Sequence, residues 1–124
     1  IAGTAVGLLG VTARCDNLSD PQSVVALGSG DPVAALDCAA AGLTTAPGDS
    51  VRLVIGASAG PGSVELLEGT VTGLDITQPA RCINVTRPSV VGWPVADGIW
   101  DCRRADFDVR PGDTVRVLIT GTAR

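Results

Sequence analysis

The nine residues PGDSVRLVI, at positions 47–55, return almost unchanged as PGDTVRVLI at positions 111–119. In each copy proline fixes φ and the next glycine accepts the positive φ of a type II turn, so Pro-Gly-Asp predicts a turn. The residues after the turn, VRLVI and VRVLI, place valine, leucine or isoleucine at alternate positions. That two-residue period predicts two half-buried β-strands.

Three further pairs of matching segments occur in the same order along the chain. They are GTAVGL at 3–8 with GTVTGL at 69–74, RCDNLSDP at 14–21 with RCINVTRP at 81–88, and Cys38 with Cys102. Ordered matches of this kind predict an internal duplication of about 57 residues, with repeats at 3–59 and 69–123. We expect both repeats to lie in one domain, residues 1–124, because 124 residues are too few for two independent cores.

The composition favours an all-β fold. Hydrophobic residues make up 45% of the chain and aromatic residues only 2%, so the core is expected to be aliphatic and rich in β-branched side chains. Each repeat has segments for about four strands, and a repeat alone is marginal in size. We therefore predict a pseudo-symmetric β-sandwich or barrel of about eight strands. Residues 32–41 are the one stretch that also allows a short helical turn.

Charge and residue types exclude several classes of function. The net charge is −4, and the nine cations are arginines that form no basic stripe, so nucleic-acid binding has little support. The chain has no histidine, which excludes imidazole metal ligands and Ser-His or Cys-His dyads. No apolar run is long enough to span a bilayer. We expect no enzymatic activity, no cofactor and no membrane span.

The four cysteines are divided equally between the repeats. A duplicated unit that closed its own bond gives Cys15–Cys38 and Cys82–Cys102, one of three formal pairings. A zinc site is the rival interpretation, but neither repeat has a C-x-x-C pair and no histidine is present. Two disulfides indicate an oxidising compartment, so we expect an extracellular protein that is secreted or lies on a cell or virion surface.

The only two asparagines, Asn17 and Asn84, occupy the same place in the repeated cysteine motif. One interpretation is structural, because asparagine adopts turn conformations and bonds the backbone through its side chain. The other is N-glycosylation, because Asn-Leu-Ser and Asn-Val-Thr both match the acceptor pattern.

Four carboxylates gather near the end of the second repeat. They are Asp97, Asp101, Asp106 and Asp108. Carboxylates at this density can hold Ca²⁺, but the spacing lacks the glycine-containing pattern of a calcium loop. Arg103, Arg104 and Arg110 lie between or beside them, which favours local charge pairing. We therefore predict no metal site.

All three aromatic residues lie in the second repeat. Phe107 aligns with Leu43 of the first repeat and is expected in the core. Trp93 and Trp100 have no counterpart. Trp100 can pack on the nearby Cys102 disulfide, or both indoles can stack on a ligand at the surface.

The segments CAAAGLTTAPGDSVRLVIGASA and CRRADFDVRPGDTVRVLITGTA resemble the ends of immunoglobulin-like repeats of bacterial cell-wall and secreted surface proteins. The resemblance covers about 22 residues of each repeat and implies an extracellular structural β module. It does not extend to a wall-sorting motif.

Two functional hypotheses follow. The first is a non-enzymatic structural or assembly subunit of a surface layer, filament or virion, whose partner is itself or another surface protein. In this hypothesis the strands at the two ends of the chain add to the edge of a neighbouring sheet. The alternative is a secreted module that binds carbohydrate or protein through Trp93 and Trp100.

Overall fold

The computed structural model describes residues 1–30, 32–60, 68–93, 98–103 and 106–124. The described residues form eleven strands. These are β1 (Ala2–Val6), β2 (Leu8–Asn17), β3 (Gln22–Leu27), β4 (Val33–Asp37), β5 (Ser50–Ala59), β6 (Glu68–Thr72), β7 (Leu74–Ile76), β8 (Ala80–Asn84), β9 (Ser89–Trp93), β10 (Ile99–Asp101) and β11 (Thr114–Ala123).

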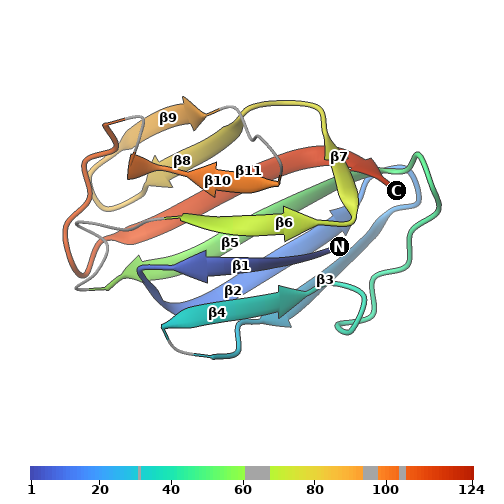
Figure 1. The fold of residues 1–124 in the computed structure, drawn as a ribbon, viewed down its shortest axis with the longest axis horizontal. Helices are drawn as coiled ribbons and strands as arrows, with labels where there is room; N and C mark the ends of the chain where they lie inside the picture. Colours follow the sequence, from blue (N-terminus) through green and yellow to red (C-terminus); the bar gives the residue numbers. More distant parts are fainter. Residues whose placement is uncertain (31, 61–67, 94–97, 104–105) are drawn as a thin grey trace.

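The strands build two sheets that pack face to face (Figure 1). The smaller sheet has the order β10-β6-β1-β4, and the larger has the order β3-β2-β5-β11-β8-β9, with β7 beside β11. All pairings between these strands are antiparallel. The prediction of an all-β fold is confirmed, and of the two predicted architectures the structure agrees with the sandwich.

The chain has more strands than the eight or so predicted, and two of the additional ones arise because two glycines turn the chain from one sheet to the other. Gly7 has a φ of 88° and lies between β1 of the smaller sheet and β2 of the larger one. Gly73 has a φ of 86° and lies between β6 and β7 in the same way. A positive φ is costly for residues other than glycine. Each glycine therefore ends a strand at a point where the apolar pattern predicts that the strand continues.

The segment with helical character is a strand followed by a turn. Residues 33–37 form β4, and their side chains alternate between exposed and buried positions. A hydrogen bond with helical spacing occurs only at the end of this strand, where the N–H of Ala41 donates to the carbonyl of Asp37 over 3.2 Å. Antiparallel pairing with β1 overrides the helix propensity of the alanines.

The core follows the alternation of the two long strands β5 and β11. The side chains of Val51, Leu53 and Ile55 are buried, as are those of the matching residues Val115, Val117 and Ile119. Each such side chain contributes roughly 1.5–3 kcal/mol on burial. The two buried faces that the opening stretch predicts are therefore confirmed.

Matching strands meet at the centre of each sheet. In the larger sheet β5 pairs with β11, and Val54 lies opposite Leu118. In the smaller sheet β1 pairs with β6, and Thr4 lies opposite Thr70 with their hydroxyl oxygens 2.8 Å apart. Each of these residues faces the residue that the sequence match assigns to it in the other segment.

The first and last strands are interior strands, which corrects the expectation that they offer free edges. β1 lies between β6 and β4, and β11 lies between β5 and β8. The edges are instead β4 and β10 in the smaller sheet and β3 and β9 in the larger sheet. Among the described residues no helix has the length and apolar character needed to cross a membrane.

Candidate functional site

Both disulfides join one sheet to the other. Cys15 of β2 is bonded to Cys38, the residue after β4, and Cys82 of β8 is bonded to Cys102, the residue after β10. These are the pairs that the repeat argument predicts. Since β2 and β8 belong to the larger sheet and β4 and β10 to the smaller, each bond fixes one side of the sandwich.

Asn17 closes a network of hydrogen bonds at one end of the sandwich. Its Nδ2 donates to the carbonyl of Thr44 over 3.0 Å and to Oδ2 of Asp49 over 2.9 Å. Its Oδ1 accepts from the N–H groups of Ser19 and Asp20, both at 3.1 Å. One buried amide therefore ties the turn after β2 to the Pro-Gly-Asp turn before β5.

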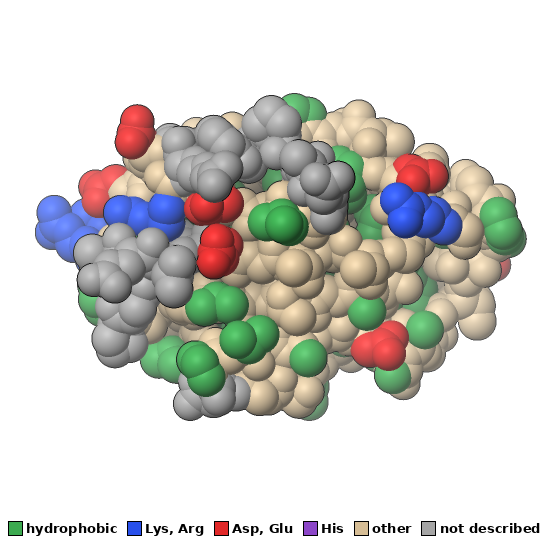
Figure 2. Space-filling view, in the orientation of Figure 1, with side chains coloured by type: hydrophobic (Ala, Val, Ile, Leu, Met, Phe, Trp, Pro, Cys, Tyr) green, Lys and Arg blue, Asp and Glu red, His purple; other side chains and the backbone are tan. Residues whose placement is uncertain are grey.

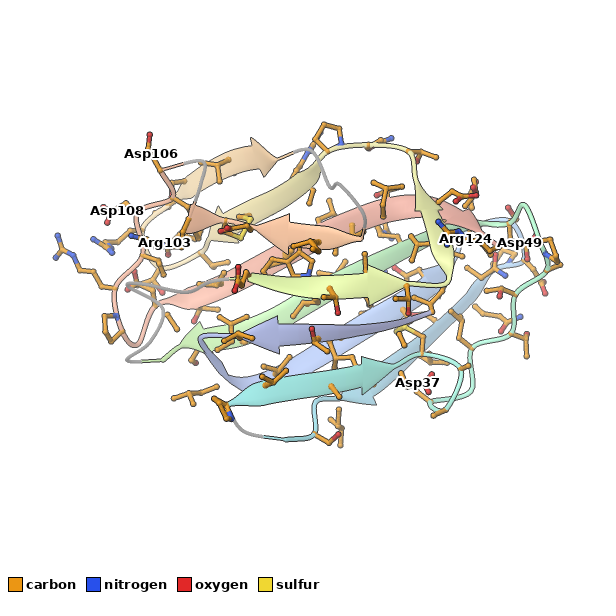
Figure 3. The ribbon with its side chains drawn as sticks, in the orientation of Figure 1. Asp37, Asp49, Arg103, Asp106, Asp108 and Arg124 are labelled. Carbon is orange, nitrogen blue, oxygen red and sulfur yellow. A yellow bond between two sulfur atoms is a disulfide. The ribbon has the colours of Figure 1, made fainter. Side chains whose placement is uncertain are left out.

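Asn84 closes an equivalent network of hydrogen bonds in the second half of the chain. Its Nδ2 donates to the carbonyl of Asp108 over 3.1 Å and to Oδ2 of Asp113 over 2.9 Å. Its Oδ1 accepts from the N–H of Arg87 over 3.0 Å. Asp49 and Asp108 lie at opposite ends of the molecule (Figure 3), so each end has one such network.

The hydroxyl residue of each asparagine motif also has a structural partner. Ser19 Oγ accepts from the N–H of Ser50 over 2.8 Å, and Thr86 Oγ1 accepts from the N–H of Thr114 over 2.9 Å. Ser50 and Thr114 are the first residues of β5 and β11. The hydroxyls thus bond the N–H groups at the start of the two central strands.

Burial of both asparagines argues against the glycosylation hypothesis. Asn17 is 1% exposed and Asn84 is 0% exposed. A glycan on Nδ2 would remove a donor that is already bonded and would need space inside the protein. The pattern Asn-x-Ser/Thr is explained here by turn structure, which was the other interpretation of these two positions.

The aspartates of the Pro-Gly-Asp turns are the polar residues that the sequence interpretation missed. Gly48 and Gly112 have φ values of 90° and 91°, as the predicted type II turns require. In each turn the aspartate Oδ2 also accepts a backbone N–H three residues back, from Ala46 and Arg110. The signal was present, because this aspartate is kept in both copies of the opening stretch.

These contacts stabilise the ionised carboxylates. Hydrogen bonds from the Arg110 N–H, the Asn84 amide and the Arg87 guanidinium lower the pKa of Asp113 to about 2. The N–H of Ala46 and the amide of Asn17 lower the pKa of Asp49. Both carboxylates therefore remain charged at neutral pH and serve as fixed acceptors.

A third carboxylate, Asp16, is buried in β2 between two arginines. Arg14 Nε lies 3.0 Å from its Oδ1, and Arg52 Nη2 lies 3.0 Å from its Oδ2. Burial raises the pKa of Asp16, but hydrogen bonds from Arg14, Ser23 and Arg52 outweigh burial and lower it overall. The arrangement pairs charges, and the lowered pKa of Asp16 is the opposite of the raised pKa that a general acid needs.

The predicted acidic cluster does not form a metal site in the part of the chain that the structure describes. Asp106 and Asp108 are exposed and point away from the sandwich (Figure 3). Asp108 lies 3.6 Å from Arg87, and Asp101 Oδ1 accepts the N–H of Arg103. The described residues contain no group of three or more His, Cys, Asp or Glu that could hold a metal ion. Asp97 and Arg104 lie outside the described residues.

The aromatic side chains that the structure describes belong to the core. Phe107 and its counterpart Leu43 are both buried, as expected. Trp100 is 0% exposed, and its ring lies against Gly69, where a Cβ would come within 2.5 Å of the indole. The core interpretation of Trp100 therefore holds, and the hypothesis of ligand stacking loses this residue. Trp93 is the last residue of β9, and its side chain lies outside the described part.

A shallow groove of about 710 Å³ runs along the side of the sandwich where β3 and β4 end the two sheets. It is lined by three consecutive residues of each strand, 25–27 and 35–37. Alternate residues of a strand face opposite ways, so a lining of consecutive residues indicates that the groove follows the strand edges. Ala2, Thr4 and Thr70 extend it onto the smaller sheet. The sequence interpretation did not find this groove.

The outer surface of the smaller sheet has little charge at its centre. Figure 2 shows most charged side chains of this face towards its two ends.

Searches of family models, curated proteins and solved structures found no match to the chain. The resemblance to immunoglobulin-like surface repeats therefore stays a prediction.

Proposed function

We propose that this chain is an extracellular structural subunit without enzymatic activity, which assembles with copies of itself in a surface layer, filament or virion. The observation that carries this proposal is an uncharged edge strand, β3, with large apolar side chains exposed to solvent. Natural sheets usually protect such an edge with charge, proline or a bulge. An unprotected edge on a stapled sandwich favours pairing with another sheet.

Disulfides that join the two sheets support the extracellular part of the proposal. Such bonds persist in oxidising compartments and are rare in the reducing cytosol. Both bonds are buried, and the cysteines that form them are 0–1% exposed. The chain therefore combines a small hydrophobic core with two covalent links between its layers, which suits a durable subunit outside the cell.

We also propose that the molecule arose by duplication of a unit that paired with itself. This is supported by the central pairings, where Val54 faces Leu118 and Thr4 faces Thr70. Backbone bonds at the ends of β5 and β11 match as well, since Gly112 donates to Ala59 and Gly48 to Ala123, both over 2.8 Å. Each half supplies the partner strand that the other half needs.

Sedimentation velocity across a range of concentrations tests the structural-subunit proposal. We expect the native protein to shift to larger species as its concentration rises. A protein that sediments as a monomer at every concentration would contradict the proposal. A solvent-exposed Trp93 side chain, together with binding of the protein to glycans on an array, would then favour the binding-module hypothesis.

A further inference from the structure

β3 is the edge strand best suited to receive another strand. It pairs with β2 along one side, from Gln22 to Leu27, and the described residues place no strand along its other side. Val25 is 63% exposed and Leu27 is 75% exposed. No charged residue occurs between Asp20 and Asp31, so the whole of β3 is neutral.

Two of the other three edges have protective features, and the third is shorter than β3. β4 follows Pro32 and ends at Asp37, and β10 has only three residues and ends at Asp101. β9 follows Arg87 and Pro88, as β3 follows Asp20 and Pro21, but it has five residues against six in β3. Charge, proline and short length all oppose edge pairing. β3 has none of these along its six residues.

The sequence of β3 suits a second copy of itself. A two-fold axis across two antiparallel strands keeps outward residues opposite outward residues. Centred on Val25, the pairing places the two Val25 side chains together and each Leu27 beside a Ser23. Because β3 is neutral, two chains of net charge −4 can meet there without placing like charges opposite each other.

We propose that β3 pairs antiparallel with β3 of a second copy, centred on Val25, and so joins two larger sheets into one continuous sheet. This inference rests on the proposed function and names its contact surface. The groove beside β3 gives room for the edge of the second copy to approach. A six-residue edge buries less than the roughly 800 Å² per partner of a standard interface, so we expect a reversible dimer.

The test compares Val25→Lys with Val90→Lys by sedimentation velocity. Val90 is the matched control, because it is 62% exposed and lies on β9, the opposite edge of the same sheet. Both substitutions add one positive charge. Val25→Lys places two like charges opposite each other at the axis and should leave a monomer, while wild type and Val90→Lys should both dimerise.

Three results would overturn the inference in different ways. If wild type and Val25→Lys both assemble, the structural-subunit proposal stands but β3 is not the contact. If both variants are monomeric while wild type assembles, β3 joins β9 of the next copy, and the closed dimer is wrong. If wild type is monomeric, both proposals fail.

Hydrogen exchange on the wild-type protein gives a test that needs no variant. The β3 amides that point away from β2 should become more protected as the protein concentration rises across the dimer transition. Amides of β9 should not change. If β3 exchanges at the same rate in monomer and assembly, the pairing is excluded even where Val25→Lys fails to fold.

Discussion

At the scale of single residues, Asn84 shows how one amide can hold a fold together. Replacing it with alanine leaves the Asp108 carbonyl, the Arg87 N–H and one acceptor position of Asp113 without their partner. A buried group left unsatisfied costs about 1–3 kcal/mol. We expect Asn84→Ala to lower the free energy of unfolding by at least this amount in urea titrations.

Gln78→Ala is the control for that substitution, because Gln78 is exposed and surface changes usually stay within about 0.5 kcal/mol. Asn84→Asp keeps the shape but places a second carboxylate against Asp113, so it should be less stable than Asn84→Ala at neutral pH. Equal stability of Asn84→Ala and Gln78→Ala would show that the network contributes nothing.

The charge of Asp113 gives the protein a pH dependence of known sign. Its pKa is lowered to about 2 in the folded chain, against roughly 3.9 in an unfolded one. A lowered pKa means that the carboxylate stabilises the fold above about pH 4 and that this stability is lost as the pH falls towards 2. The lowered pKa values of Asp49 and Asp16 act in the same direction.

Thermal melts at pH 7, 4 and 2.5 would measure this dependence. We expect wild type to lose stability between pH 4 and 2.5, and Asp113→Asn to be less stable at pH 7 with a weaker response to acid. The two melting curves should approach each other at the lowest pH. Parallel losses in both proteins would mean that Asp113 is not among the groups that set the acid response.

At the scale of elements, the sequence predicted those strands whose pattern is local. The alternation after each Pro-Gly-Asp turn identified β5 and β11, and the positive φ of Gly48 and Gly112 agrees with the predicted turns. The corner at Gly7 was missed, because nothing in an apolar run tells a glycine within a strand from a glycine between two sheets. Sheet order was also out of reach, since pairing of β1 with β6 joins residues far apart in the chain.

The same limit applies to the candidate site. Repetition of RCDNLSDP as RCINVTRP indicated that the asparagines matter, but not that their partners are Asp49 and Asp113, which lie about 30 residues further on. Val25 and Leu27 are exposed at an edge because the larger sheet ends at β3, and that depends on the order of the strands. A neutral run such as QSVVAL is equally consistent with a central strand.

At the scale of the whole molecule, stability depends on links between two thin layers. The smaller sheet has four strands, and its buried residues are uneven in size: Ala5 and Ala34 are small, whereas Trp100 of β10 is the largest fully buried side chain. Small side chains bury less apolar area, so packing beneath β1 and β4 stabilises the contact between the layers less than packing around Trp100 does. The two disulfides compensate, because each joins the layers on a different side of the centre.

Removing the disulfides therefore tests the whole architecture. They close loops with sequence separations of 23 and 20, and loop-closure entropy assigns each a stabilisation of roughly 3 kcal/mol. Serine at both cysteines of one pair should cost about that much, and loss of both pairs should cost about twice as much, which is comparable with the roughly 5–15 kcal/mol of a whole domain. We expect the protein without either bond to unfold near physiological temperature.

Calorimetry at two protein concentrations separates the two ways in which this prediction can fail. An unchanged melting temperature that does not depend on concentration would mean that the aliphatic core alone holds the sheets together. The melting temperature could instead be unaffected by loss of the disulfides but rise with protein concentration. That result would mean that contacts between copies hold the sheets together, because a partner that binds only the folded state raises its stability by mass action. In that case the β3 edge would stabilise the monomer's own fold as well as the assembly, and Val25→Lys should restore the sensitivity to reduction.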